Sequence, residues 1–285
     1  MPPLQLRSVA AALALLLPAT TALADADADL LARGAYLVDG IMGCGNCHTP
    51  LGPDGPVVGA ALSGRLVEDS AAFTAWAPNI TPAGRIRDWS DDELARAIRE
   101  GLRPDGSLIG PPMPFSAYRG LSDDDLSAVV AYLRTVPAIE NATSASAYRI
   151  PLPPAYGPPV EAVAAPPRGA TAEYGGYLAM SVAHCMECHT PMGPQGPMYD
   201  AYLGQGGFEF AGPWGVSVAP NLTSHADGLA GYSDAEVKAM IVEGHRPDGS
   251  AMLPPMPYAY LARMAPEDLA AVLRYLRALP PLPDP

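Results

Sequence analysis

Two five-residue motifs contain every cysteine of the chain, and they constrain its fold more than any other feature. The motifs are Cys44-Gly45-Asn46-Cys47-His48 and Cys185-Met186-Glu187-Cys188-His189. Two cysteines separated by two residues and followed at once by a histidine form the attachment signature of c-type haem. The thiols add to the porphyrin vinyl groups as thioethers, and the histidine becomes the proximal ligand of the iron. Two copies therefore predict two covalently bound haem c groups and a role in electron transfer.

Other chemistry of a Cys-x-x-Cys pair explains these motifs less well. A structural zinc site needs four ligands that close around the metal, with a spacing of their own. A thioredoxin-like redox pair lies in a pattern of alternating strands and helices, which this sequence lacks. Neither these sites nor a structural disulfide requires a histidine after the second cysteine, and here it occurs twice.

The sequence of the first half returns in the second half at a nearly constant offset. Besides the cysteine motifs, the recurring segments are Ala77-Pro78-Asn79-Ile80-Thr81 with Ala219-Pro220-Asn221-Leu222-Thr223, Arg103-Pro104-Asp105-Gly106 with Arg246-Pro247-Asp248-Gly249, and Pro111-Pro112-Met113-Pro114 with Pro254-Pro255-Met256-Pro257. Such repetition predicts two similar domains, at 25–136 and 171–285. Residues 137–170, rich in Pro, Ala and Ser, are expected to form an extended linker.

The hydrophobic spacing predicts a mostly helical structure. Ser90 and Ser233 each begin a capping box, and the helices that they open are expected to end at Gly101 and Gly244. Further helices are expected at 27–38, at 171–183, after Ser122 and from Pro266. No strand pattern is strong in either half, and the remaining segments are loops rich in Gly and Pro.

The segment 1–24 is typical of an export signal. Arg7 precedes an apolar stretch at 9–17, and Ala22-Leu23-Ala24 provides small residues for cleavage. A membrane span needs about 20 apolar residues, so an uncleaved anchor is the less favoured alternative. The mature protein is expected to begin near Asp25 in the periplasm, the kind of compartment in which haem c is attached.

The charge of the chain limits its partners. The formal net charge is −13 at pH 7, and haem propionates would make it more negative. Such an acidic protein is not expected to bind nucleic acid, and it would dock on basic patches of a protein partner.

Two methionines are candidates for the distal ligands of the irons. Met113 follows His48, and Met256 follows His189, at nearly the same separation along the chain. Each stands in the same Pro-Pro-Met-Pro frame, whose prolines fix the local backbone. A lone methionine would be read as filling a gap in the core, but recurrence in the same frame favours ligation. Ligation by histidine and methionine raises the reduction potential relative to two histidines. The same ligation predicts two low-spin haems.

Other repeated residues are candidates for contacts around the haems. Arg103 and Arg246 could pair with propionates, because a guanidinium matches a carboxylate in shape and charge. Asn79 and Asn221 could form hydrogen bonds near a haem edge, or they could hold a turn. A loop-structural role is the alternative for all four residues.

The chain resembles class I-type dihaem cytochromes c, and more narrowly the cytochrome c subunits of periplasmic, membrane-bound alcohol, aldehyde and gluconate dehydrogenases. The resemblance rests on the Gly-x-Tyr-Leu lead to each motif, Cys-x-x-Cys-His-Thr-Pro, Ala-Pro-Asn-Ile-Thr, the helix start at Trp89-Ser90-Asp91-Asp92-Glu93-Leu94, Arg-Pro-Asp-Gly and Pro-x-Met-Pro. It implies two tandem, mostly α domains, each folded around one haem. It also implies His48 with Met113 on one iron and His189 with Met256 on the other. Those subunits commonly carry three haems, whereas this sequence contains two motifs.

The expected function is therefore to relay electrons, without being an enzyme itself, from a dehydrogenase partner to quinone, another cytochrome or an oxidase. Any association with the membrane would be peripheral and through that partner. The alternative is a haem enzyme, such as a dihaem peroxidase or an oxidoreductase of small sulfur compounds. Such an enzyme needs an iron with an open or releasable site, and the two matching methionine loops argue against one. A sensor of small ligands would need an attached signalling domain.

Overall fold

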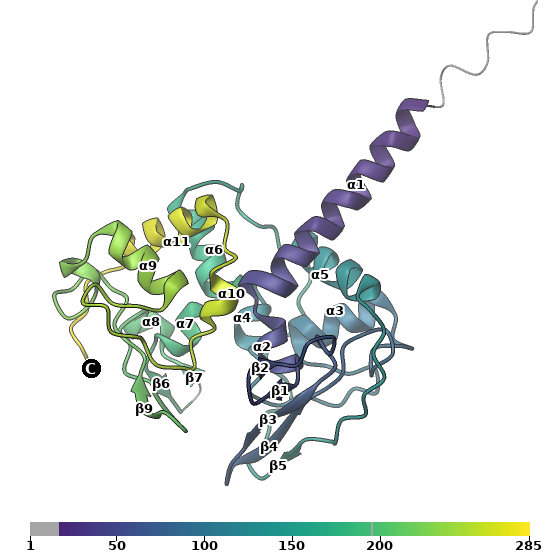
Figure 1. Ribbon diagram of the computed structural model, residues 1–285, viewed down its shortest axis with the longest axis horizontal. Coiled ribbons are helices and arrows are strands. Elements are labelled where there is room, and N and C mark those ends of the chain that lie inside the picture. The colour runs from purple at the N-terminus through teal and green to yellow at the C-terminus, as the bar shows by residue number, and fades with distance from the viewer. Residues whose placement is uncertain (1–16, 195) are drawn as a thin grey trace, which may run out of the picture.

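The computed structural model describes the backbone of residues 17–194 and 196–285, so most of the expected signal peptide lies outside the described residues. In this part of the chain, none of the helices combines the length and the apolar character that a membrane span requires. Figure 1 shows two halves side by side, with α1 (Leu17–Tyr36) projecting away from the body.

The N-terminal half (residues 25–136) and the C-terminal half (residues 171–285) share one order of elements, to which the C-terminal half adds α8 and η3. After α1, the N-terminal half contains the π-helix η1 (Leu37–Ile41), α2 (Cys44–His48), β1 (Leu51–Gly52), β2 (Gly55–Pro56), β3 (Arg65–Asp69), β4 (Phe73–Ala77), α3 (Asp91–Glu100), α4 (Phe115–Tyr118) and α5 (Asp123–Thr135). The C-terminal half contains α6 (Ala172–Tyr177), the π-helix η2 (Leu178–Val182), α7 (Cys185–Cys188), β6 (Met192–Gly193), β7 (Gly196–Pro197), α8 (Tyr199–Tyr202), β8 (Glu209–Gly212), β9 (Gly215–Val218), the 3-10 helix η3 (Leu229–Gly231), α9 (Asp234–Glu243), α10 (Tyr258–Leu261) and α11 (Pro266–Ala278). Between the halves lies one short strand, β5 (Ala147–Tyr148).

The predicted helix ends are confirmed. The Ser90 hydroxyl accepts from the backbone of the third residue of α3, whose carboxylate accepts from the Ser90 N–H in return, and Ser233 does the same for α9. Both helices end at glycines in the left-handed conformation, Gly101 with φ 70° and Gly244 with φ 69°. These caps satisfy backbone groups that a helix end would otherwise leave unpaired.

One helix crossing in each half depends on a glycine. A Cβ added to Gly34 of α1 would lie 2.1 Å from the Ala128 carbonyl oxygen of α5, and one added to Gly175 of α6 would lie 1.9 Å from that of Ala271 in α11. Both distances are far inside van der Waals contact. The crossings α1–α5 and α6–α11, which close each half, therefore need glycine at these positions.

Short antiparallel strands are the main departure from the expected fold. β3 pairs with β4, and β8 pairs with β9, in hairpins that the sequence did not predict. β5, from the expected linker, pairs with the free edge of β4 and makes a three-stranded sheet. Within the described residues β9 has no neighbour other than β8. Strands of two to five residues are too short for an alternating apolar pattern to stand out.

A single hydrophobic core runs through both halves. The helix faces expected to be apolar are buried in it, namely Leu126, Val129, Val130 and Leu133 of α5 and Leu269, Val272, Leu273 and Leu276 of α11. At the contact between the halves, α4 packs against η2 and α10 packs against η1. Figure 1 shows α4 and α10 between the two halves.

Two tyrosines exchange hydrogen bonds between the halves. The Tyr36 hydroxyl donates to Asp268 of α11 at 2.7 Å and accepts from the Ala265 N–H at 3.0 Å. The Tyr177 hydroxyl donates to Asp125 of α5 at 2.7 Å and accepts from the N–H of Ser122 at 3.1 Å. Their place in the sequence suggests packing alone, but each tyrosine also donates a hydrogen bond to a buried carboxylate of the opposite half.

Candidate haem sites

Each histidine of the cysteine motifs is held by one ring nitrogen. His48 ends α2 and is 7% exposed, and His189 follows α7 and is 5% exposed. Their Nδ1–H groups donate to the carbonyls of Pro78 and Pro220, both at 2.8 Å. A carbonyl only accepts, so the ring proton is on Nδ1, and Nε2 keeps the lone pair that an iron ligand needs. Burial lowers the pKa of both imidazoles, which favours their neutral form.

The cysteines lie in a single helical turn directly in front of these histidines. Residues three apart share one face of a helix, so Cys44 and Cys47, and likewise Cys185 and Cys188, present their thiols together. None of the four forms a disulfide. Burial raises the pKa of Cys44 to about 12 and that of Cys185 to about 11, so these thiols are neutral. The donor set of each half fits a haem held by two thioethers beside its histidine ligand.

The two candidate methionine ligands occupy equivalent places. Met113 precedes α4 and Met256 precedes α10, and in each case the methionine carbonyl accepts from the N–H two residues on, that of Phe115 at 2.9 Å and that of Tyr258 at 3.0 Å. Both side chains are partly buried and pack against the same core as the motif cysteines. Met180 and Met252 of the C-terminal half border the same core. The choice of Met113 and Met256 as distal ligands therefore rests on their repeated Pro-Pro-Met-Pro frame and stays a prediction.

Each cysteine motif is also contacted by the helix that follows the methionine of the opposite half. Ser116 of α4 donates to the Glu187 carboxylate of α7 at 3.1 Å. Burial raises the pKa of Glu187 to about 7 despite this bond. Tyr260 of α10 covers α2, because a Cβ added to Gly45 would lie 2.7 Å from the Tyr260 hydroxyl oxygen. The two candidate sites are therefore neighbours across the contact between the halves.

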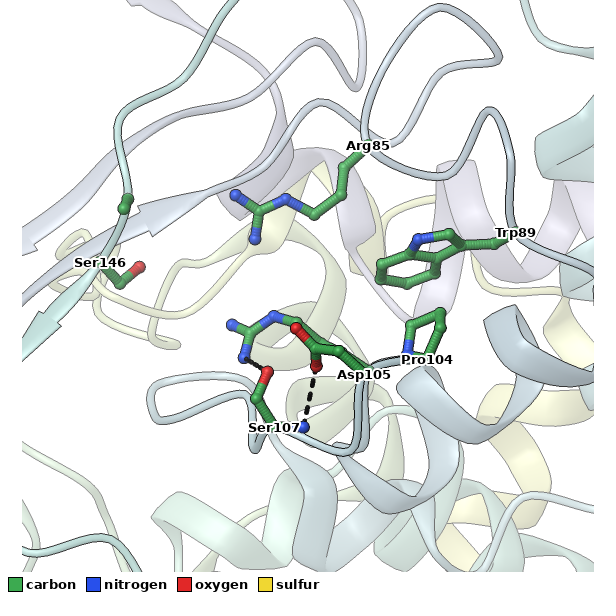
Figure 2. Close-up of a pocket in the computed structure, with 8 residues that line it drawn as sticks. Arg85, Trp89, Pro104, Asp105, Ser107 and Ser146 are labelled. Carbon is green, nitrogen blue, oxygen red and sulfur yellow. Dashed lines mark hydrogen bonds between the residues drawn. The ribbon is translucent and has the colours of Figure 1, made fainter.

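Arg103 borders a cavity of about 520 Å³ in the N-terminal half. Figure 2 shows Arg85 and Trp89 on one side of this cavity, with Asp105 and Ser107 on the other. Arg103 donates to the Ser107 hydroxyl at 3.1 Å, and burial together with the nearby Arg85 lowers its pKa. Two guanidinium groups beside one carboxylate leave an excess of positive charge, which suits the carboxylates of a propionate.

Arg85 was not predicted from the sequence, because it does not recur in the second half as the candidate residues do. Two equivalent hydrogen bonds align the halves at this point, because Arg134 donates to the Ile86 carbonyl as Arg277 donates to the Leu229 carbonyl. The residue in front of Leu229, at the place of Arg85, is Gly228. The surroundings of the two candidate sites therefore differ in charge.

Arg246 and the two asparagines have backbone contacts in the structure. Arg246 donates to the Ala251 carbonyl at 3.4 Å, as Arg103 donates to that of Leu108 at 2.6 Å. Asn79 donates to the carbonyls of Ile139 and Asn141 while its own oxygen accepts from Thr81, and Asn221 holds Leu282 and Thr223 in the same manner. The asparagines thus tie the chain that follows α5 and α11 to a turn, and a place beside a haem edge stays a prediction for them.

Comparisons with known proteins agree with this geometry. Residues 31–137 match the family described as cytochrome c. The chain is 31% identical over 283 residues to the alcohol dehydrogenase (quinone) cytochrome c subunit of Gluconobacter oxydans, covering 91% of this chain and 57% of that protein. It is 29% identical over 281 residues to the gluconate 2-dehydrogenase cytochrome c subunit of Pantoea cypripedii, covering 90% of this chain and 62% of the relative.

A shorter relative is a diheme cytochrome c-type protein of Cereibacter sphaeroides, which is 28% identical over 256 residues, with 84% of this chain and 82% of the relative covered. The present chain spans less than two thirds of the length of both dehydrogenase subunits. The histidine and cysteine geometry and these similarities together lead to one identification. The chain contains a cytochrome c domain at residues 31–137 and is a homologue of the cytochrome c subunits of alcohol, fructose and gluconate dehydrogenases.

Proposed function

We propose that this chain is a dihaem c-type cytochrome that relays electrons and does not itself transform a substrate. Its two haem domains would be residues 25–136 and 171–285, joined by a linker at 137–170. The proposal is supported above all by one observation, the anchoring of both motif histidines through Nδ1 to a proline carbonyl, which leaves each Nε2 for an iron. A bound haem supplies a one-electron iron couple.

The ligands of the first iron would be His48 and Met113, and those of the second would be His189 and Met256. The cysteines of each motif would hold the porphyrin. Arg103 and Arg85 are suited to hold the propionates of the first haem, since both face the same cavity. In the second half this role would fall to Arg246 alone.

The arrangement of the halves supports transfer between the two haems. Ser116 and Tyr260 place the helix after each distal methionine against the cysteine motif of the opposite half. The contact between the halves is buried and hydrogen-bonded, so the two sites stay at a fixed separation. An electron entering at one haem would therefore find the other as its nearest acceptor.

The partner would be a dehydrogenase that delivers electrons, with quinone, another cytochrome or an oxidase as acceptor. The named relatives are subunits of such dehydrogenases. The net charge of −13 favours a partner with a basic docking surface. The setting would be the periplasm, after export by a cleaved signal peptide at 1–24, with any membrane association through the partner.

The test is a redox-titrated absorption spectrum of the purified haem protein. We expect two haems per chain, a weak far-red band from methionine on ferric iron in both, and no reaction of the reduced protein with carbon monoxide. Met113→Ala and Met256→Ala should each remove half of the far-red band. A high-spin haem in the unaltered protein, or one that binds carbon monoxide, would instead favour an enzyme such as a peroxidase.

A further inference from the structure

The segment between the halves lies over the loop that presents Met113. β5 brings Tyr148 to this loop, where its hydroxyl donates to the Pro111 carbonyl at 3.0 Å. The Tyr148 ring also covers Gly110, since a Cβ added there would lie 2.4 Å from a ring carbon. Because Gly110 has no side chain, the ring can rest directly on the backbone two peptide units before Pro112.

A second tyrosine from the same segment contacts the loop on both sides of Met113. The Tyr156 hydroxyl donates to the Ile109 carbonyl at 2.8 Å. Its ring stacks on Phe115, with 4.9 Å between centroids and 25° between planes. Phe115 follows Met113 by two residues, so aromatic rings from outside the loop contact the chain on both sides of the methionine.

The corresponding loop of the C-terminal half is held by much less. Leu253 stands in the place of Gly110 and is 46% exposed. Its neighbour Pro254 accepts one hydrogen bond, from the exposed Ser217 hydroxyl of β9 at 2.5 Å. Tyr258, in the place of Phe115, has a buried hydroxyl without a partner. In the described part of the chain, no strand covers β9 as β5 covers β4, and no aromatic hydroxyl donates to this loop.

We propose that Tyr148 and Tyr156 are positioning residues that keep Met113 on its iron, so that small nitrogen or carbon ligands such as imidazole and cyanide displace Met256 first. This inference rests on the proposed haem ligation. Displacement breaks the bond from sulfur to iron and forms one from the incoming ligand, with no change in oxidation state. Displacing Met113 also breaks the two tyrosine hydrogen bonds and the ring stacking that hold its loop. Displacing Met256 breaks only the hydrogen bond from the Ser217 hydroxyl.

The test is a titration of the oxidised holoprotein with imidazole, followed by loss of the far-red band. We expect two equal steps whose half-saturating concentrations differ at least about tenfold, since each hydrogen bond shifts such an equilibrium by roughly three- to tenfold. Met256→Ala should retain only the step at high concentration, and Met113→Ala only the step at low concentration. This assigns the two steps without relying on the spectrum alone.

Conservative variants then test the tyrosines. Tyr148→Phe and Tyr156→Phe keep the rings and remove the hydroxyls, so each should move the second step roughly threefold or more toward lower concentration and leave the first step in place. Ser217→Ala should move only the first step. Tyr202→Phe, at an exposed tyrosine of α8, is the matched control and should move neither.

The possible failures are distinguishable. Absence of the far-red band from both haems of the unaltered protein would refute the proposed methionine ligation itself. If both bands are present but vanish in one step, or if Met113 is displaced first, the ligation stands and the positioning role is refuted. The role is also refuted if both Tyr→Phe variants retain the second step of the unaltered protein.

Discussion

Replacing the buried carboxylate of Asp125 by an amide should strongly destabilise the protein. Asp125 accepts two hydrogen bonds from the guanidinium of Arg33, at 2.7 and 2.8 Å, and one from Tyr177 at 2.7 Å. The side chains of Arg33 and Asp125 are only 10% and 3% exposed. In Asp125→Asn the Arg33 charge stays buried without its counter-charge. One of the two N–H donors of Arg33 then faces the amide NH2 group of the asparagine, which is also a donor.

The magnitude follows from the burial of this pair. Removing one partner of a buried ion pair costs about 3–5 kcal/mol, a large part of the roughly 5–15 kcal/mol that stabilises a typical domain. The chain offers a matched control in Asp268, which accepts from Tyr36. The place of Arg33 in the repeat is held in the second half by Tyr174, which carries no charge to lose a partner. Asparagine can still accept from a tyrosine, so Asp268→Asn should cost only about 1 kcal/mol.

The assay is unfolding of the oxidised holoprotein in guanidinium chloride, with the free energy of unfolding taken from the midpoint and slope. We expect Asp125→Asn to lower it by at least about 2 kcal/mol more than Asp268→Asn does. Adding Arg33→Met to Asp125→Asn should recover part of the loss, because it removes the uncompensated charge. Equal losses in the two aspartate variants, or no recovery, would refute the assignment of the effect to a buried charge.

Three further predictions concern acid stability, a helix crossing and the cavity lined by Arg85 and Arg103. Burial alone would raise the pKa of Asp125, but the bond to Arg33 and its charge outweigh this and hold the pKa below its ordinary value of 3.8. A depressed pKa stabilises the folded state at pH values above the pKa of the unfolded chain, and this contribution is lost as the pH falls through the pKa of the folded state. The loss of stability in Asp125→Asn should therefore shrink below about pH 4, as unfolding curves at pH 7, 4 and 3 would show. Gly34→Ala and Gly175→Ala should each lower the free energy of unfolding by about 1–3 kcal/mol through overpacking; a loss below about 0.5 kcal/mol would contradict the required close approach. Arg85→Gln should lower the reduction potential of the haem proposed for the N-terminal half, because a nearby cation disfavours the more positive ferric state. A redox titration should show the potential of the other proposed haem unchanged.

Local sequence signals predicted the ends of α3 and α9 correctly, whereas the short helices α4, α8 and α10 lie in segments expected to be loops. Ser90 with Glu93 forms a capping box within four residues, and Gly101 can stop the same helix by its own conformational freedom, so neither needs tertiary context. The two-residue strand β5 could not be predicted in this way. It exists because the edge of β4 is available to the linker, and that is a property of the folded half.

The contacts between the halves were equally invisible in the sequence. Tyr36 and Asp268 are 232 residues apart, and Tyr177 and Asp125 are 52 apart. Repetition showed that both tyrosines recur, but not that each reaches across to the other half. Arg85 was missed for the opposite reason, since repetition cannot reveal a residue that serves a single half. Both cases show that repetition reports what two units share and omits what joins or distinguishes them.

The exchanged tyrosine–aspartate bonds also bear on how such a chain could arise. When residue i of one unit meets residue j of another, and j meets i in return, the contact is isologous, the kind that two identical subunits form around a two-fold axis. Duplication and fusion of a gene for a self-associating one-haem protein would give this arrangement without redesigning the contact. The difference between Arg33 and Tyr174, which hold equivalent places in the two halves, would then be a later divergence, available only once the two copies could mutate independently.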